Sequence, residues 1–300
     1  MANRDRFELL ILGVIWGASF LFMRIAVPEF GAFALVEVRI GIAALFLIGL
    51  LAWRGGLGHL RGSALPMMIV GIFSSALPFA LFAYAVTFLT SGMTAVINTA
   101  TPMFAALVAY FWLNDRLTAT RIVGLLIGFG GVVLSAWDKI SFNGGSTTLA
   151  VLAALGASLS YGLGMNYTKK QLSGVPPLAA ATGSSLAATL LLIPLAATNW
   201  PSVTPSLNTW LCVIALGVLC TGVAYVFYFR LIARIGPSKA STSVYLVPVF
   251  GMLWGFIFLH ETITAHMLIA CPIIVLGTAL ASGNVTFRTR TPVAEGASRA

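Results

Sequence analysis

The ionisable side chains of this sequence are few and scattered, which limits the chemistry that it can perform. There are eight carboxylates and three histidines among 300 residues. The histidines, which all fall in loops or near the ends of apolar segments, are His59, His260 and His266. An enzyme needs several such groups brought to one place, and the three cysteines show no metal-ligand spacing. We therefore expect no enzyme activity, no cofactor and no metal.

The other candidate functional residues are polar or aromatic side chains and prolines inside apolar segments. They are Trp16, Ser19, Tyr84, Asn98, Thr101, Pro102, Tyr161, Asn166, Tyr245 and Pro248. Asn98, Thr101 and Pro102 are spaced three and four apart, so one helix face can carry them. Each polar group could also simply tie two helices together. As a set they predict a weakly polar, aromatic-lined, uncharged cavity that suits a neutral or zwitterionic solute with an apolar body.

The segments that carry these residues are too apolar for a water-soluble domain. Hydrophobic residues make up 59% of the chain and charged residues only 8%, against about 25% charged in ordinary soluble domains. Ten runs have the roughly 20 apolar residues that a spanning helix needs. Their expected limits are 7–27, 33–53, 64–89, 92–113, 119–137, 148–168, 177–198, 207–233, 237–260 and 265–284. We predict an all-α integral membrane protein with ten transmembrane helices.

The basic residues favour one orientation in the membrane. With ten helices and the N-terminus in the cytoplasm, fourteen Lys and Arg residues fall inside and three outside, namely Arg24, Arg39 and Lys139. This bias follows the positive-inside rule and places both termini in the cytoplasm of an inner membrane. Because the basic residues lie singly or in pairs at the ends of apolar runs, the net charge of +9 does not indicate nucleic acid.

An internal repeat divides the chain. Pro102 precedes Asp115 by thirteen residues, as Pro248 precedes Glu261, and the two blocks are 146 residues apart. Each half then contains five helices, so the second half enters the membrane the other way up. We expect a first repeat at 1–143, an inverted second repeat at 144–287 and a disordered cytoplasmic tail at 288–300. The two prolines should kink their helices in mid-membrane and expose backbone carbonyls there.

Several motifs resemble the drug/metabolite transporter superfamily, specifically its EamA-type ten-helix exporters. The resemblance covers nearly the whole chain. It is carried by Trp16-Gly17 with Ser19, by Arg39, by Pro102…Asp115-Arg116-Leu117, and by Tyr228-Phe229-Arg230-Leu231-Ile232 leading to Gly236 and Pro248…Glu261. Asp115 replaces the more usual Glu in the first block. The resemblance implies export of small metabolites, and a YddG-like exporter of aromatic or neutral amino acids is the specific expectation.

The mode of transport remains open between two alternatives. The chain has no nucleotide-binding loop of the form G-x-x-x-x-G-K-[ST], so it is not an ATP-driven pump on its own. Glu37 is the one acid expected within a helix body, near its outer end, and the centre of the membrane should lack acids. This favours facilitated diffusion by alternating access over proton antiport. A membrane-embedded enzyme is the alternative from another class.

The expected partners are a small-molecule substrate and membrane lipid. Small-residue pairs occur at Gly13/Gly17, Gly124/Gly128 and Gly251/Gly255. Such pairs let helices approach closely, either within one chain or between two. A monomer or a weak homodimer is therefore expected.

Overall fold

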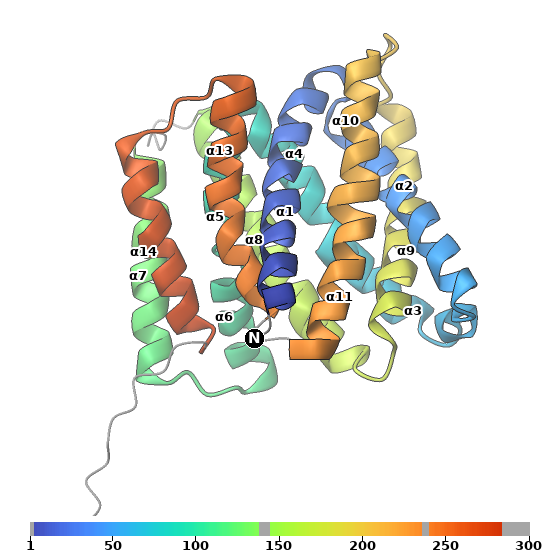
Figure 1. The fold of residues 1–300 in the computed structure, drawn as a ribbon, viewed down its shortest axis with the longest axis horizontal. Coiled ribbons are helices and arrows are strands. Elements are labelled where there is room, and N and C mark those ends of the chain that lie inside the picture. The colour runs from blue at the N-terminus through green and yellow to red at the C-terminus, as the bar shows by residue number, and fades with distance from the viewer. Residues whose placement is uncertain (1–2, 138–144, 236–239, 284–300) are drawn as a thin grey trace, which may run out of the picture.

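The protein is helical throughout the part of the chain that the computed structural model describes, residues 3–137, 145–235 and 240–283 (Figure 1). Nine helical stretches within these ranges are long and apolar enough to cross a membrane, and Ala265–Ala281 adds a shorter apolar helix. A helix of this last length spans about 26 Å, close to the hydrocarbon thickness of a bilayer. The prediction of an all-α membrane protein is confirmed. The tail expected at 288–300 lies outside the described residues.

Several of the membrane-crossing stretches are built from more than one helical segment. In the first half the elements are α1 (Asn3–Phe30), α2 (Ala32–Trp53), η1 (Leu57–Leu60), α3 (Ala64–Gly71), η2 (Ile72–Ala76), α4 (Leu77–Phe88), α5 (Ser91–Asn98), α6 (Thr101–Leu113) and α7 (Ala119–Ala136). In the second half they are α8 (Ser146–Gln171), α9 (Pro177–Thr198), α10 (Leu207–Gly217), η4 (Val218–Val223), α11 (Ala224–Ile235), η5 (Ser241–Leu246), α13 (Val247–Leu259) and α14 (Ala265–Ala281).

The fourth and ninth expected helices are interrupted, which corrects the expectation of a kinked but continuous helix at each proline. α5 ends at Asn98, and Pro102 stands in the first turn of the next helix, α6. Pro248 likewise stands in the first turn of α13, after the 3-10 segment η5. Proline is well tolerated there because its missing N–H has no intrahelical partner in the first turn. The first of these helices therefore ends at Asn98 and restarts at Thr101, whereas at the second site a 3-10 segment passes directly into α13.

Local backbone features recur 146 residues apart. π-helical turns begin at Ile72 and again at Val218. α6 and α13 are followed by Asn114 and His260, both in the left-handed conformation with φ 52°. The Thr118 hydroxyl then accepts a hydrogen bond at the start of α7, and the Thr264 hydroxyl does so at the start of α14. The two halves of the sequence thus fold into the same series of helix breaks and caps.

The two halves run in opposite directions through the molecule. α1 begins in the lower part of Figure 1, and the connection from α6 to α7 runs along the lower edge. The corresponding connection from α13 to α14 runs along the upper edge. Consequently α7 and α14, which pack against each other, enter the structure from opposite sides.

Glycines allow the closest helix approaches, and these contacts lie within the chain. A Cβ atom added to Gly17 of α1 would lie 2.9 Å from the backbone nitrogen of Gly251 in α13. One added to Gly277 of α14 would overlap the backbone of Gly128 in α7. The small-residue pairs of the sequence therefore serve intramolecular packing, as their spacing allows.

The outer faces of the helices carry large apolar side chains. Trp53, Phe111 and Leu126 are 80%, 78% and 69% exposed, whereas Phe30, Phe82 and Met103 are fully buried between the helices. A water-soluble protein rarely leaves extensive apolar surface open. This surface is suited to lipid.

Candidate functional site

A cavity of about 270 Å³ lies in the centre of the helical bundle. This volume is near the lower end of the roughly 300–1,000 Å³ typical of ligand pockets, so it suits a small ligand. α1, α2, α4, α8 and α11 form its walls, together with the helix breaks and π-helical turns of both halves. Its lining residues are Trp16, Ser19, Phe20, Met23, Arg39, Ser74, Phe79, Phe82, Asn98, Thr101, Tyr161, Met165, Cys220, Thr221, Tyr225, Tyr228, Val244 and Val247.

Both halves contribute equivalent positions to this lining. The pairs separated by 146 residues are Ser74/Cys220, Phe79/Tyr225, Phe82/Tyr228, Asn98/Val244 and Thr101/Val247. Trp16 and Tyr161 are related in the same way with a separation of 145. The members of a pair differ in polarity: the first half places an amide and a hydroxyl at the break where the second half places two valines. The cavity is therefore symmetric in position and asymmetric in chemistry.

Half of the residues selected from the sequence line this cavity. They are Trp16, Ser19, Asn98, Thr101 and Tyr161. Asn98 closes α5 and Thr101 opens α6, and the Thr101 hydroxyl lies 3.3 Å from Asn98 Oδ1. The helix break thus turns two polar side chains of adjacent helices toward the cavity.

The other selected residues lie elsewhere in the fold. Asn166 of α8 donates to the Ala105 carbonyl of α6 at 2.9 Å, so it ties two helices together. The Tyr245 hydroxyl lies 3.1 Å from Ser282 Oγ, after the end of α14. Tyr84 packs against the Phe88 ring. Pro102 and Pro248 start α6 and α13 and so create the breaks without lining the cavity.

Aromatic rings form much of the cavity wall. The rings of Trp16 and Tyr228 meet edge to face with centroids 5.4 Å apart, and those of Phe20 and Phe82 do so at 5.5 Å. The Tyr161 ring lies 6.1 Å from that of Phe82. Such contacts hold the rings rigidly and leave their apolar faces available to a ligand. The repeat offset was the signal that could have identified Phe79 and Phe82, because it relates them to two tyrosines.

Arg39 is the cavity residue that departs from the sequence prediction. We assigned it to the outer set of basic residues and expected an uncharged cavity, but Arg39 lines the cavity and is only 3% exposed. Its guanidinium carbon lies 3.8 Å from the centre of the Phe79 ring, and its Nε donates to Thr221 Oγ1 at 3.3 Å. The signal was available, because a charged residue inside an apolar span marks a functional site by default.

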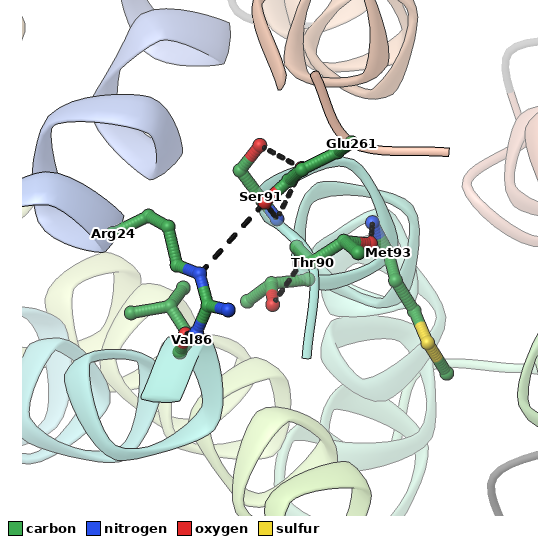
Figure 2. A network of polar contacts seen from close by, with 7 residues as sticks. Arg24, Val86, Thr90, Ser91, Met93 and Glu261 are labelled. Carbon is green, nitrogen blue, oxygen red and sulfur yellow. Dashed lines mark hydrogen bonds and ion pairs between the residues drawn. The ribbon is translucent and has the colours of Figure 1, made fainter. Parts of the chain in front are cut away.

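A network of polar contacts joins α1 and the start of α5 to the α13–α14 connection (Figure 2), which runs along the upper edge of Figure 1. The carboxylate of Glu261, just after α13, accepts hydrogen bonds from the backbone N–H of Ser91 at 2.9 and 3.0 Å and from the Ser91 hydroxyl at 2.7 Å. Arg24 of α1 lies 3.8 Å from the same carboxylate and donates to the Val86 carbonyl of α4. An anion at the N-terminus of α5 is stabilised by the free N–H groups and the helix dipole.

A second ionic cluster ties the lower ends of α1 and α11 together. Arg234 of α11 contacts Asp5 at 3.2 Å and also pairs with Glu8 of α1. Arg4 and Arg230 contact the same Glu8 carboxylate at 3.3 and 3.9 Å. Three arginines from two helices thus surround the buried Glu8 carboxylate, so the cluster fixes how the two ends pack.

The described residues contain no group of three or more His, Cys, Asp or Glu side chains that could hold a metal ion. Within the same part of the chain the three cysteines are free, and two of them are buried. The arrangement offers an aromatic and weakly polar cavity with one cation, which suits binding of a small solute rather than bond cleavage.

Comparison with known proteins agrees with this arrangement. The family model described as EamA-like transporter family matches residues 7–137 and 148–283. The uncharacterized transporter YvbV of Bacillus subtilis is 26% identical, over 93% of this chain and 91% of its own length. A probable terminal-alkyne amino-acid exporter of Streptantibioticus cattleyicolor is 24% identical over 84% of both chains. A solved crystal structure covers 95% of this chain and 98% of its own with a TM-score of 0.65, and at 21% identity it supports the fold.

Proposed function

Because the chain belongs to the EamA-like transporter family, we propose that it exports a small neutral or zwitterionic metabolite, such as an amino acid, through the central cavity. Membership of this family makes it a multi-pass membrane transporter and not an enzyme. The amino-acid assignment draws on the printed name of one relative, an amino-acid exporter, and on the aromatic walls of the cavity. A YddG-like preference for aromatic or neutral amino acids is the specific form of the proposal.

The observation that carries this proposal is the lining of the cavity by equivalent positions of both halves. In secondary transporters, inverted repeats place the substrate site near the membrane centre, and exchange of the two conformations opens it to each side in turn. The antiparallel course of α7 and α14 and the recurrent helix breaks support such an organisation, with repeats at 1–143 and 144–287. We propose alternating access as the mechanism.

The proposed setting is a bacterial inner membrane with both termini in the cytoplasm, as the distribution of Lys and Arg favours. On this assignment the lower edge of Figure 1 faces the cytoplasm and the network around Glu261 closes the outer end. The glycine contacts are used within one chain, which supports a monomer or a weak homodimer.

Proton-coupled antiport is the second candidate, and one residue favours it. One carboxylate oxygen of Glu37 in α2 is buried without a hydrogen-bond partner among the described residues. A carboxylate at membrane depth is a common proton carrier. However, Glu37 is absent from the cavity lining, so proton binding there would have to act through movement of α2. This makes facilitated export the better-supported mode.

A flux assay in proteoliposomes tests both modes. Vesicles loaded with single neutral or aromatic amino acids should release them down their gradient in proportion to the amount of reconstituted protein. An imposed pH gradient should change the rate little. Uphill movement driven by a pH gradient, lost in Glu37→Gln, would establish antiport instead. Failure to move any amino acid, with protein that is folded by thermal melting, would remove the amino-acid assignment.

A further inference from the structure

Arg39 has no equivalent in the other half of the molecule. The positions 145 and 146 residues later are Ser184 and Ser185, and neither lines the cavity. Arg39 lies two turns into α2, about 11 Å along the helix from its first residue. It is therefore a single fixed cation at one side of a cavity in which many of the other lining positions occur in related pairs.

The contacts of Arg39 leave its charge without a counter-ion. Its described hydrogen bonds run from Nε to Thr221 Oγ1 at 3.3 Å and from Nη1 to Met23 Sδ at 3.4 Å, and the second acceptor is a weak one. No carboxylate of the described residues lies within ion-pair distance of it. A guanidinium has five N–H donors. Burying such a charge is costly unless an anion or a full set of hydrogen bonds compensates it.

The surroundings hold the guanidinium in place and leave part of it available. The Phe79 ring covers one face at 3.8 Å. Thr221 is itself fixed, because its hydroxyl donates to the Leu216 carbonyl at 3.0 Å within the π-helical turn η4. A positioned arginine fork matches the two oxygens of a carboxylate.

We propose that Arg39 binds the carboxylate of the transported solute and so restricts the substrates to monocarboxylates with an apolar or aromatic body. This inference rests on the proposed function in taking the central cavity as the transport site. The rings of Trp16, Phe82 and Tyr228 receive the apolar body. The cavity lining contains no acidic side chain, so an amine that lacks a carboxylate would meet Arg39 without a charged partner and is excluded.

The test compares probes that share a phenyl ring on a two-carbon chain and differ in whether they carry a carboxylate, an amine or both, on the purified full-length protein. Thermal stabilisation and competition with flux are measured for phenylalanine, 3-phenylpropionate, phenylalaninamide and phenethylamine. The two carboxylates should stabilise the wild type and compete, and the amide and the amine should do so at least about tenfold more weakly, since a hydrogen bond to a charged group is worth about 1.5–3 kcal/mol. A wider set of monocarboxylates, from acetate to 3-indolepropionate, covers differences in size.

Arg39→Gln should abolish the preference for carboxylates, and Arg39→Lys should retain part of it because it keeps the charge without the fork. Arg54→Gln, at the exposed end of the same helix, is the matched control and should keep the wild-type preference. If Arg39 only stabilises the fold, its variants would melt earlier and still prefer carboxylates, which would overturn the proposal. Wild-type protein that binds phenethylamine as well as phenylalanine, or that binds none of the monocarboxylates, would also overturn it without any mutation.

The outcome separates this inference from the proposed function. Stabilisation by 3-phenylpropionate that depends on Arg39, without any amino-acid flux, would retain the carboxylate site and refute amino-acid export. Flux of phenylalanine and phenethylamine at equal rates would refute the role of Arg39 and retain a transporter.

Discussion

Glu261 and Asp115 occupy equivalent positions in the two halves, but their carboxylates have different surroundings. Each follows a helix that ends in a left-handed residue, and the backbone N–H of each bonds six residues back, to Gly255 and Ala109. Glu261 then turns inward to Ser91 and Arg24 and is 13% exposed. Asp115 is 49% exposed and pairs only with the neighbouring Arg121 at 3.5 Å among the described residues.

The residue beneath each carboxylate differs accordingly. A Cβ atom at Gly255 would overlap the Glu261 carboxylate and the Ser91 hydroxyl. Ala109, at the equivalent position of α6, already carries such a methyl group, and the Asp115 carboxylate points to the surface. Equivalent sequence and backbone therefore give a mostly buried Glu261 carboxylate that contacts Ser91 and Arg24, and an exposed Asp115 carboxylate that pairs with Arg121. The difference depends on which helix packs against each end, and the position equivalent to Ser91 lies outside the described residues.

The largest expected effect concerns the two sides of the membrane. In a variant without native cysteines, single cysteines at Arg116 and Thr262, both exposed and 146 residues apart, should react with an impermeant reagent from opposite sides. Gly58→Cys, in the exposed η1 helix, should react from the same side as Arg116→Cys, the cytoplasmic side. Labelling of Arg116→Cys and Thr262→Cys from one side would contradict the inverted repeat.

The next largest effect is the difference in protein stability between variants that lack the Glu261 carboxylate and variants that lack the Asp115 carboxylate. Glu261→Ala should lower the free energy of unfolding by about 2–3 kcal/mol, because it removes hydrogen bonds to a charged acceptor and leaves the α5 N-terminus unsatisfied. Asp115→Ala should cost at most about 1 kcal/mol, as for exposed ion pairs. Unfolding in mixed detergent micelles measures both. Glu261→Gln is the control and should be intermediate, since its amide oxygen still accepts from Ser91. Equal losses at both positions would show that the difference in burial between the two carboxylates does not affect the free energy of unfolding.

A smaller effect is expected from exchanging the residues beneath the carboxylates. Gly255→Ala should destabilise by about 1–3 kcal/mol through overpacking, whereas Ala109→Gly should cost only about 0.5–1 kcal/mol of helix propensity. The same unfolding measurement applies. If the clash with Glu261 causes the loss, Gly255→Ala should cost much less in a Glu261→Ala background. Strict additivity would argue against that cause.

The smallest stability effect distinguishes a polar side chain inside the cavity from one outside it. Tyr245→Phe removes the hydrogen bond to Ser282 and should cost about 0.6 kcal/mol, the average for such bonds in membrane proteins, with transport per folded molecule unchanged. Asn98→Ala should reduce flux or apparent affinity at nearly normal stability, because Asn98 lines the cavity. Melting and flux are measured on the same preparations. A pure stability loss in Asn98→Ala would remove it from the site.

The sequence by itself determined the apolar helices, the spacing of the two proline–acid blocks and five of the eighteen residues that line the cavity. Helix length is encoded locally, because each crossing needs its own run of apolar residues. The offset between the proline–acid blocks is also a property of the chain alone. Trp16, Ser19 and Asn98 could be selected because polar or bulky groups within an apolar run stand out, whatever the packing. Asn98 and Thr101 both line the cavity, but the helix ends between them, so the prediction that one helix face carries them together with Pro102 was wrong.

Only the tertiary structure decided what each polar group contacts. Asn166 and Tyr245 met the same sequence criteria as Asn98. However, Asn166 hydrogen-bonds to a carbonyl of α6, and Tyr245 hydrogen-bonds to the Ser282 hydroxyl. Arg39 could have pointed to the membrane surface, and instead the packing of α2 against η4 and α4 encloses it beside Thr221 and Phe79. Burial and hydrogen bonding depend on residues that are distant along the chain, so a local pattern places a charge at a certain depth but does not determine which helix covers it.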